Sequence, residues 1–125
     1  MNLFGRRLFI LIADDNEDLA KSLSMLLSLV GFDVETVHDG RDALRAALAH
    51  PPDAVLLDIG LPGMDGLQVA EQMRSDPRLK DIFIIAISGY GPEMFEGRSQ
   101  RAGFDHHLVK PVAFNTITSL LARLH

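Results

Sequence analysis

Five apolar segments of strand length constrain the fold of this 125-residue chain more than any other feature. They cover residues 8–13, 34–37, 54–57, 82–87 and 107–109, and turn or charged residues bound each of them. Several of these segments are apolar throughout and do not alternate with polar residues. A strand without alternation is buried on both faces, which is typical of a parallel sheet covered by helices. The pattern therefore predicts an α/β fold with a parallel sheet at its centre.

Segments with helical spacing separate these strands. The first helix is predicted to begin after the N-cap Asn16 and to end at Gly31. Similar spacing predicts helices around residues 43–48, 67–73 and 117–124, and a weaker helix over 92–102, where Gly97 costs about 1 kcal/mol relative to alanine. This alternation predicts a doubly wound sheet with its ligand site at the carboxyl ends of the strands. The apolar stripe of the first helix is predicted to contain Leu19, Leu23, Leu26, Leu27 and Val30.

Carboxylates stand at two of these strand ends. Asp14 and Asp15 follow the first apolar segment directly, and Asp58 follows the third. Capping of the next helix is one explanation of the first pair, because carboxylates complement the positive end of a helix dipole. Metal binding is the other, because a divalent cation relieves the repulsion between neighbouring carboxylates. If the first and third strands are neighbours, the three carboxylates converge and form a candidate metal site.

A hydroxyl and an ammonium group stand at the ends of the last two strands. Ser88 is followed by Gly89, and Lys110 is followed by Pro111. Taken singly, such residues are a local backbone cap and a solvated surface charge. Together with three carboxylates, they suit a phosphoryl group and a magnesium ion, because the charged and hydrogen-bonding groups can stabilise the phosphoryl oxygens.

Four short motifs carry these residues: Ala-Asp-Asp-Asn at 13–16, Leu-Asp-Ile-Gly-Leu-Pro-Gly-Met-Asp-Gly at 57–66, Ser-Gly at 88–89 and Leu-Val-Lys-Pro at 108–111. Each is weak alone, but all four in this order are specific. The chain resembles, over nearly its full length, the response-regulator receiver domains of two-component signalling, including chemotaxis regulators and the receivers of hybrid sensor histidine kinases. The resemblance implies a flavodoxin-like α/β fold, with a five-stranded parallel sheet of order 2-1-3-4-5 and five helices on its two faces.

The resemblance also implies a role for each matching residue. Asp58 would be the phosphoacceptor, and Lys110 and Ser88 would contact the phosphoryl oxygens. The donor would be a histidine kinase or a histidine phosphotransfer protein, and the modified domain would signal to an unidentified downstream protein. Because it would catalyse only its own phosphorylation and dephosphorylation, the chain is not expected to be an enzyme. Mg²⁺, or Mn²⁺ in its place, would be held by Asp14, Asp15, Asp58 and the backbone carbonyl of Gly60.

A conformational switch is a further implication of the resemblance, and it would begin at Ser88. The family usually carries Tyr or Phe where this chain has His107, which is smaller and titratable. A partly exposed surface histidine without a switching role is the alternative interpretation of His107. Tyr90 is predicted to control the access of water to the phosphoryl group, and the fourth helix with its preceding loop is predicted to be the mobile output element.

Composition narrows the class of function. The chain has no cysteine, which excludes disulfide scaffolds and thiolate zinc sites. Its net charge of -5 and scattered basic residues argue against nucleic-acid binding, and no apolar segment reaches the length of a membrane helix. We therefore expect one cytoplasmic receiver domain over residues 1–125, monomeric or weakly dimeric, with no nucleic-acid or membrane partner. A phosphorylation-independent interaction module with the same fold is the alternative function.

Overall fold

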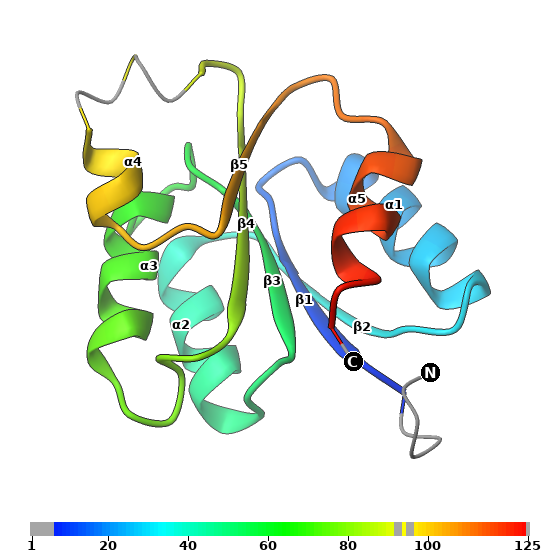
Figure 1. Ribbon diagram of the computed structural model, residues 1–125, viewed down its shortest axis with the longest axis horizontal. Helices are drawn as coiled ribbons and strands as arrows, with labels where there is room; N and C mark the ends of the chain where they lie inside the picture. The colour runs from blue at the N-terminus through cyan, green and yellow to red at the C-terminus, as the bar shows by residue number, and fades with distance from the viewer. Residues whose placement is uncertain (1–6, 92–93, 95–96, 125) are drawn as a thin grey trace.

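The computed structural model describes residues 7–91, 94 and 97–124, and its centre is a five-stranded parallel sheet (Figure 1). The strand order is β2-β1-β3-β4-β5, which confirms the predicted topology. Each predicted strand is present, with bounds that differ by at most one residue from those expected. In chain order the elements are β1 (Phe9–Ala13), α1 (Glu17–Leu29), β2 (Asp33–Val37), α2 (Gly40–Ala49), β3 (Ala54–Asp58), α3 (Gly66–Ser75), β4 (Phe83–Ser88), α4 (Arg98–Arg101), β5 (His106–Val109) and α5 (Phe114–Leu121).

The helices cover both faces of the sheet, with α1 and α5 on one face and α2, α3 and α4 on the other (Figure 1). Four of them have at least eight residues, whereas α4 is a single turn. The predicted helix over 92–102 is therefore confirmed only for that turn, and residues 92, 93, 95 and 96 lie outside the described part of the chain. Gly97 precedes the turn with a φ of 81°, a left-handed conformation that glycine tolerates and a helix interior does not.

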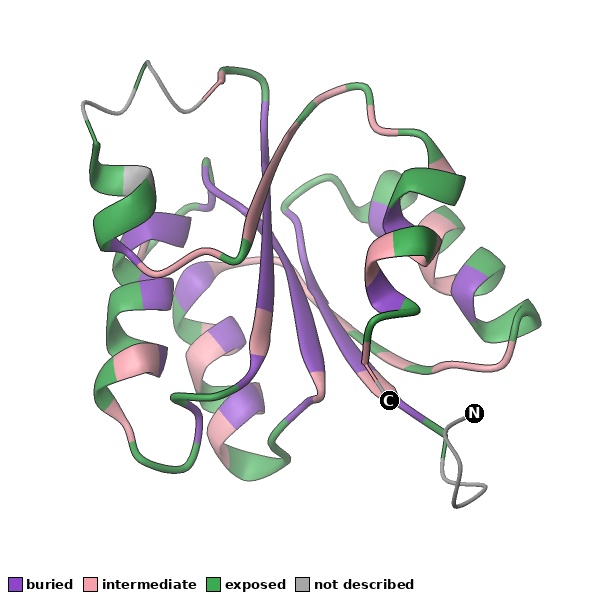
Figure 2. Ribbon diagram, in the orientation of Figure 1, coloured by how far each residue is buried: buried purple, intermediate pink, exposed green. Residues whose placement is uncertain are grey.

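The core consists of two apolar clusters that the sheet separates. Every residue of β3 is buried, as are all but the first residues of β1 and β4, whereas the edge strand β2 is half-exposed (Figure 2). Successive residues of a strand point to opposite faces, so Leu11 joins the cluster beneath α2 and α3 and Ile10 joins the cluster beneath α1 and α5. This two-sided burial explains why the strands are continuous apolar runs in the sequence.

The chain's polar residues set the helix starts. Asn16, the predicted N-cap, accepts a hydrogen bond from the Leu19 N–H at 3.1 Å. Asp65 caps α3 in the same way by accepting from the Gln68 N–H, and the Gln68 side-chain oxygen accepts from the Asp65 N–H, which completes a capping box. Because the caps fix where each helix begins, the loops that precede α1 and α3 keep a defined course at the ends of β1 and β3.

Helix α1 packs differently from the prediction. Its buried residues are Ala20 and Leu27, while Leu19 and Leu26 are each 45% exposed and Val30 is 55% exposed. The predicted stripe was therefore wrong for three of its five residues: the helix is rotated so that the edge of the stripe, and not its centre, faces the sheet. Although α1 exposes these side chains, no described helix is both long and apolar enough to cross a membrane.

Arg74, in the last turn of α3, binds two loops at the end of the sheet where the strands begin. Its guanidinium donates two hydrogen bonds to the Gly103 carbonyl and one each to the carbonyls of Lys80 and Ile82, all at 2.7–3.0 Å. It also contacts the Asp105 carboxylate at 3.0 Å. These contacts satisfy backbone carbonyls of residues that lie outside the helices and strands, so Arg74 stabilises the loops before β4 and after α4.

Candidate functional site

The buried polar side chains of the described residues gather at one edge of the sheet. They are Asp14, Asp58 and Ser88, with 7%, 7% and 4% exposure. Asp14 follows β1, Asp58 ends β3 and Ser88 ends β4, and these three strands are neighbours. Burying a polar side chain is unfavourable unless other groups bind it. A cluster of such residues at the carboxyl ends of parallel strands is therefore a candidate site, as the sequence predicts.

The three predicted carboxylates converge. Asp14, Asp15 and Asp58 each offer an oxygen, and these oxygens lie within 4.8 Å of one another. Asp14 and Asp58 are buried, whereas Asp15 is exposed. Carboxylate oxygens at this spacing, with one side open to water, fit a hard divalent cation that keeps several water ligands.

Backbone groups hold the two buried carboxylates in place. The Asn16 N–H donates to Asp14 Oδ1 at 2.9 Å, and the Gly60 N–H donates to Asp58 Oδ1 at 3.0 Å. A side chain at position 66 would not fit behind Asp58, because a Cβ there would lie 2.6 Å from the Asp58 carbonyl oxygen. Gly66 therefore allows α3 to begin directly against the end of β3.

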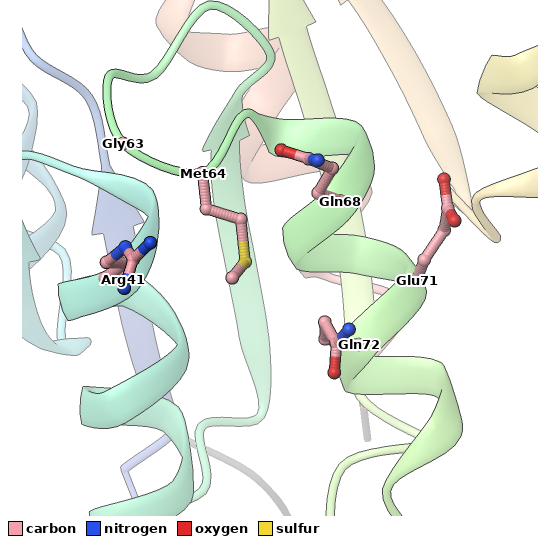
Figure 3. A pocket seen from close by; sticks show the side chains of 6 residues that line it. All are labelled: Arg41, Gly63, Met64, Gln68, Glu71 and Gln72. Atoms are coloured by element: carbon pink, nitrogen blue, oxygen red, sulfur yellow. The ribbon is translucent and has the colours of Figure 1, made fainter.

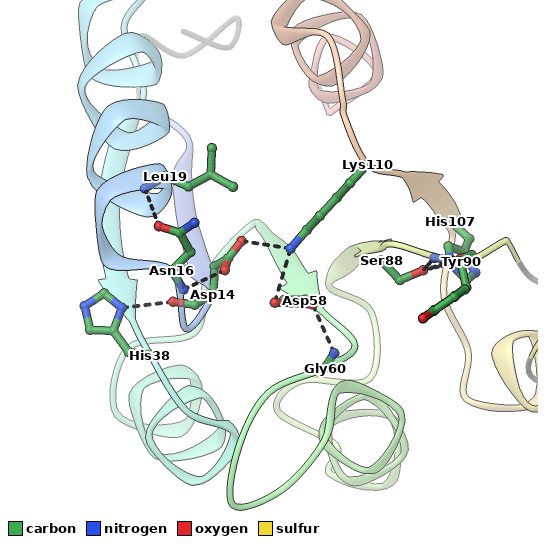
Figure 4. A network of polar contacts seen from close by, with 10 residues as sticks. All are labelled: Asp14, Asn16, Leu19, His38, Asp58, Gly60, Ser88, Tyr90, His107 and Lys110. Carbon is green, nitrogen blue, oxygen red and sulfur yellow. Dashed lines mark hydrogen bonds and ion pairs between the residues drawn. The ribbon is translucent and has the colours of Figure 1, made fainter.

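Lys110 faces both buried carboxylates. Its Nζ lies 3.4 Å from Asp58 Oδ2 and 3.8 Å from Asp14 Oδ2, as Figure 4 shows. The Lys110 N–H donates to the Ser88 carbonyl at 2.8 Å, so the ends of β4 and β5 stay paired up to the site. The peptide bond to Pro111 is cis. The pairing of β5 with β4 places the Lys110 ammonium group at the edge of the carboxylate cluster, where the sequence predicts it.

Burial raises the pKa of the Asp58 carboxyl above its ordinary value. The Gly60 N–H and the Lys110 ammonium favour the charged form and oppose the shift, while the neighbouring Asp14 carboxylate adds to it. The raised pKa means that the charged Asp58 carboxylate is less favourable in the folded protein than in water. A bound cation would lower the free-energy cost of this buried charge.

Ser88 and His107 are in direct contact. The His107 Nε2 atom lies 2.8 Å from Ser88 Oγ, and the imidazole ring packs edge-on against Phe104 with a centroid distance of 6.1 Å. Tyr90 contacts Ser88 through its backbone, while the Tyr90 residue is 63% exposed. The structure thus brings together the three residues for which a switching role is expected.

His38 is a neighbour of the site that the sequence reasoning missed. Its Nδ1 lies 2.9 Å from the Asp14 carbonyl oxygen, and its Nε2 lies 3.7 Å from a Glu17 carboxylate oxygen. No local motif could have indicated this contact, because 24 residues separate His38 from Asp14 and only the pairing of β1 with β2 brings them together.

Two hollows lie on the surface, one beside the strand ends and one between two helices. One, of about 370 Å³, lies beside Asp14 and Lys110, and its remaining lining is apolar: Leu19, Leu23, Ile87, Pro111, Val112 and Ile117. The other, of about 290 Å³, lies between α2 and α3, away from the buried carboxylates (Figure 3). It is mostly polar and is lined by Arg41, Gly63, Met64, Gln68, Glu71 and Gln72.

A parallel sheet of this order with an acidic cluster, an ammonium group and a hydroxyl at its carboxyl edge is the arrangement that the resemblance to receiver domains implies. Comparison with known proteins agrees: residues 10–122 match the response regulator receiver domain family, and the chain belongs to that family as a receiver domain of two-component systems. The response regulator MprA of Mycolicibacterium vanbaalenii is 38% identical over 115 residues, which cover 92% of this chain and 48% of that protein. The chain thus spans about half the length of the curated relatives it matches.

Solved structures agree with this assignment. The chemotaxis response regulator CheY4 of Vibrio cholerae aligns with a TM-score of 0.88 at 26% identity, over 96% of this chain and 100% of that one. The receiver domain of a sensor histidine kinase from Pseudomonas aeruginosa PAO1 aligns with a TM-score of 0.86 at 27% identity, over 95% of this chain and 98% of that one. That structure has a magnesium ion coordinated in its active-site cleft.

Proposed function

We propose that Asp58 accepts a phosphoryl group from a phosphohistidine of a histidine kinase or a histidine phosphotransfer protein. The observation that carries the proposal is the pair of buried carboxylates, Asp14 and Asp58, held within 4 Å of the Lys110 ammonium. In the reaction, an Asp58 oxygen attacks phosphorus and the bond from phosphorus to the imidazole nitrogen breaks. The electron pair returns to the imidazole, and the acyl phosphate remains on Asp58.

The residues around Asp58 have separate tasks in this step. The Lys110 ammonium neutralises negative charge on the transferring oxygens, because it already lies 3.4 Å from Asp58 Oδ2. Ser88 ends β4, which pairs with β3, and in this proposal its hydroxyl rotates to donate a hydrogen bond to one of these oxygens. The Gly60 N–H holds Asp58 Oδ1 in place, so Oδ2 is the oxygen that attacks.

Magnesium is the proposed cofactor, with Asp14, Asp15, Asp58 and the Gly60 carbonyl as its ligands. The fit rests on three carboxylate oxygens within 4.8 Å and on the raised pKa of Asp58, which a cation would lower. When bound, a divalent ion supplies charge neutralisation at the phosphoryl oxygens. Without it, the Lys110 ammonium and the N–H groups of Asn16 and Gly60 offset the repulsion between Asp14 and Asp58.

The product is a signalling state of the domain, and no external substrate is turned over. We propose that residues 1–125 act as one receiver unit, since both core clusters include residues of β1, β3 and β4. The phosphorylated domain then signals to a downstream protein.

Intact mass spectrometry after incubation with acetyl phosphate and magnesium tests the proposal. We expect the gain of one phosphoryl group, its loss on treatment with hydroxylamine, and no gain in the presence of a chelator or in Asp58→Asn. The exposed Asp81→Asn is a matched control that should react like the wild type. If the folded wild type gains no mass even from a phosphorylated kinase, the phosphorylation-independent module becomes the better assignment.

A further inference from the structure

The Ser88 hydroxyl has three polar neighbours and only one hydrogen. Its Oγ contacts the Tyr90 carbonyl oxygen, the Tyr90 N–H at 3.3 Å and the His107 Nε2 at 2.8 Å. A carbonyl oxygen can only accept a hydrogen bond, so the Ser88 hydrogen points to the Tyr90 carbonyl. The two acceptor sites of Oγ then take hydrogens from the Tyr90 N–H and from His107. This arrangement requires that Nε2 of His107 carries a hydrogen.

We propose that His107 is a positioning residue that holds the Ser88 hydroxyl away from Asp58 in the unphosphorylated protein. The inference rests on the proposed phosphorylation of Asp58. Figure 4 shows the Ser88 side chain directed toward Tyr90 and His107, on the side opposite to Asp58. To donate its hydrogen to a phosphoryl oxygen, the Ser88 hydroxyl must break its hydrogen bond to the Tyr90 carbonyl. When the side chain rotates, it also loses the hydrogen bond from His107.

The surroundings of the imidazole explain why it can perform this task. His107 lies on β5, paired with Ala86 of β4, two residues before Ser88. Contact with the Phe104 ring restricts the imidazole plane. The adjacent His106 lies on the other side of the strand, against Phe83 and Arg123.

The tautomer of His107 provides a test that does not depend on phosphorylation. In nitrogen-15 NMR spectra of the metal-free protein, the Nε2 of His107 is expected to carry a hydrogen. Addition of magnesium and fluoroberyllate, a phosphoryl mimic, should shift the His107 ring nitrogens and leave those of His106 nearly unchanged. If Nε2 is the unprotonated nitrogen of the free protein, or if the His107 signals do not respond to the mimic, the proposal is wrong.

Two variants of His107 separate the hydrogen bond from the packing of the ring. His107→Gln keeps a donor near the Nε2 position, whereas His107→Leu removes it, and His106→Leu is the matched control on the same strand. A net hydrogen bond corresponds to about a three- to tenfold change in an equilibrium constant. We therefore expect His107→Leu to bind fluoroberyllate about three- to tenfold more tightly than the wild type, and His107→Gln and His106→Leu to bind it nearly as the wild type does.

The outcomes distinguish this inference from the proposed function. Equal or weaker binding of the mimic by His107→Leu, in a protein that folds and whose wild type binds fluoroberyllate through Asp58, would refute the positioning role alone. A wild type that does not bind fluoroberyllate would refute the proposed function. In that case the tautomer of His107 in the free protein would still decide whether the hydrogen bond exists.

Discussion

Replacing Asp58 by asparagine should stabilise the metal-free protein near pH 7. The carboxylate of Asp58 is buried, and burial raises its pKa above the ordinary value, so the charged form is disfavoured in the folded state. An amide of the same shape removes the charge and keeps an oxygen for the Gly60 N–H. The substitution thus removes the proposed phosphoacceptor while strengthening the fold.

The size of the effect follows from the distances. With an effective dielectric constant of about 20, Lys110 at 3.4 Å attracts the Asp58 carboxylate by roughly 5 kcal/mol. The Asp14 carboxylate, within 4.8 Å, repels it by roughly 3.5 kcal/mol. Lys110 is partly exposed, so water screens its attraction for Asp58. The screened attraction, less the repulsion from Asp14, does not offset the cost of several kcal/mol for removing the Asp58 carboxylate from water. Because replacing buried charges by neutral groups of similar volume is often stabilising by about 1 to 4 kcal/mol, we expect Asp58→Asn to stabilise the metal-free protein by about 1 to 2 kcal/mol.

The stability difference between Asp58→Asn and the wild type should depend on pH. Because the pKa of Asp58 is higher in the folded than in the unfolded chain, its stabilising contribution is complete below the unfolded value and is lost as pH rises through the folded value. Urea unfolding should thus show no advantage of Asp58→Asn over the wild type below about pH 4 and the full advantage near pH 7. Asp81→Asn, at an exposed position, is the control that should show little change.

Magnesium should reverse the order of the two proteins. A ligand at 100 times its dissociation constant stabilises the folded state by about 2.7 kcal/mol. Asp58→Asn lacks one proposed ligand, so this gain goes mainly to the wild type and exceeds the advantage of about 1 to 2 kcal/mol that the variant has without metal. The same urea titration with saturating magnesium measures this reversal. If Asp58→Asn is less stable than the wild type without metal at pH 7, desolvation does not dominate at Asp58 and the reasoning is refuted.

Three further substitutions test the surroundings of the site. Arg74→Ala should lower the free energy of unfolding in urea by about 3 kcal/mol, because it leaves several loop carbonyls unsatisfied; an effect below about 1 kcal/mol would contradict this. Gly66→Ala should lower the melting temperature and weaken magnesium binding, because its Cβ would overlap the Asp58 backbone, whereas Gly89→Ala meets nothing within 4 Å and should be nearly neutral. Lys110→Gln should slow phosphorylation by acetyl phosphate about 100-fold, measured by intact mass, and an unchanged rate would remove Lys110 from the reaction.

The sequence predicts the sheet and the position of the site well, for a simple physical reason. A strand buried on both faces must be apolar throughout, so a polar residue at its end, such as Asp58 or Ser88, stands out. Parallel strands also bring their carboxyl ends to one edge, which makes the meeting of Asp14 with Lys110 predictable once the strand order is known.

Other features depend on packing that a periodic pattern does not contain. The spacing of apolar residues in α1 defines a stripe, but the rotation of the helix depends on its neighbours, and Leu26 and Val30 remain exposed. The contact of His107 with Ser88 depends on the register of β4 and β5, and the role of Gly66 depends on how closely α3 approaches β3. None of these three quantities is a property of a single segment.

The division of the core by the sheet has a consequence for how such a chain can diversify. The helices α1 and α5 pack on one cluster and α2 and α3 on the other, with the strands between them. Substitutions on opposite faces share few direct neighbours, so their effects on stability are expected to add. Each face can therefore acquire a new partner surface without repacking the other, while the carboxyl edge that carries Asp58 stays unchanged.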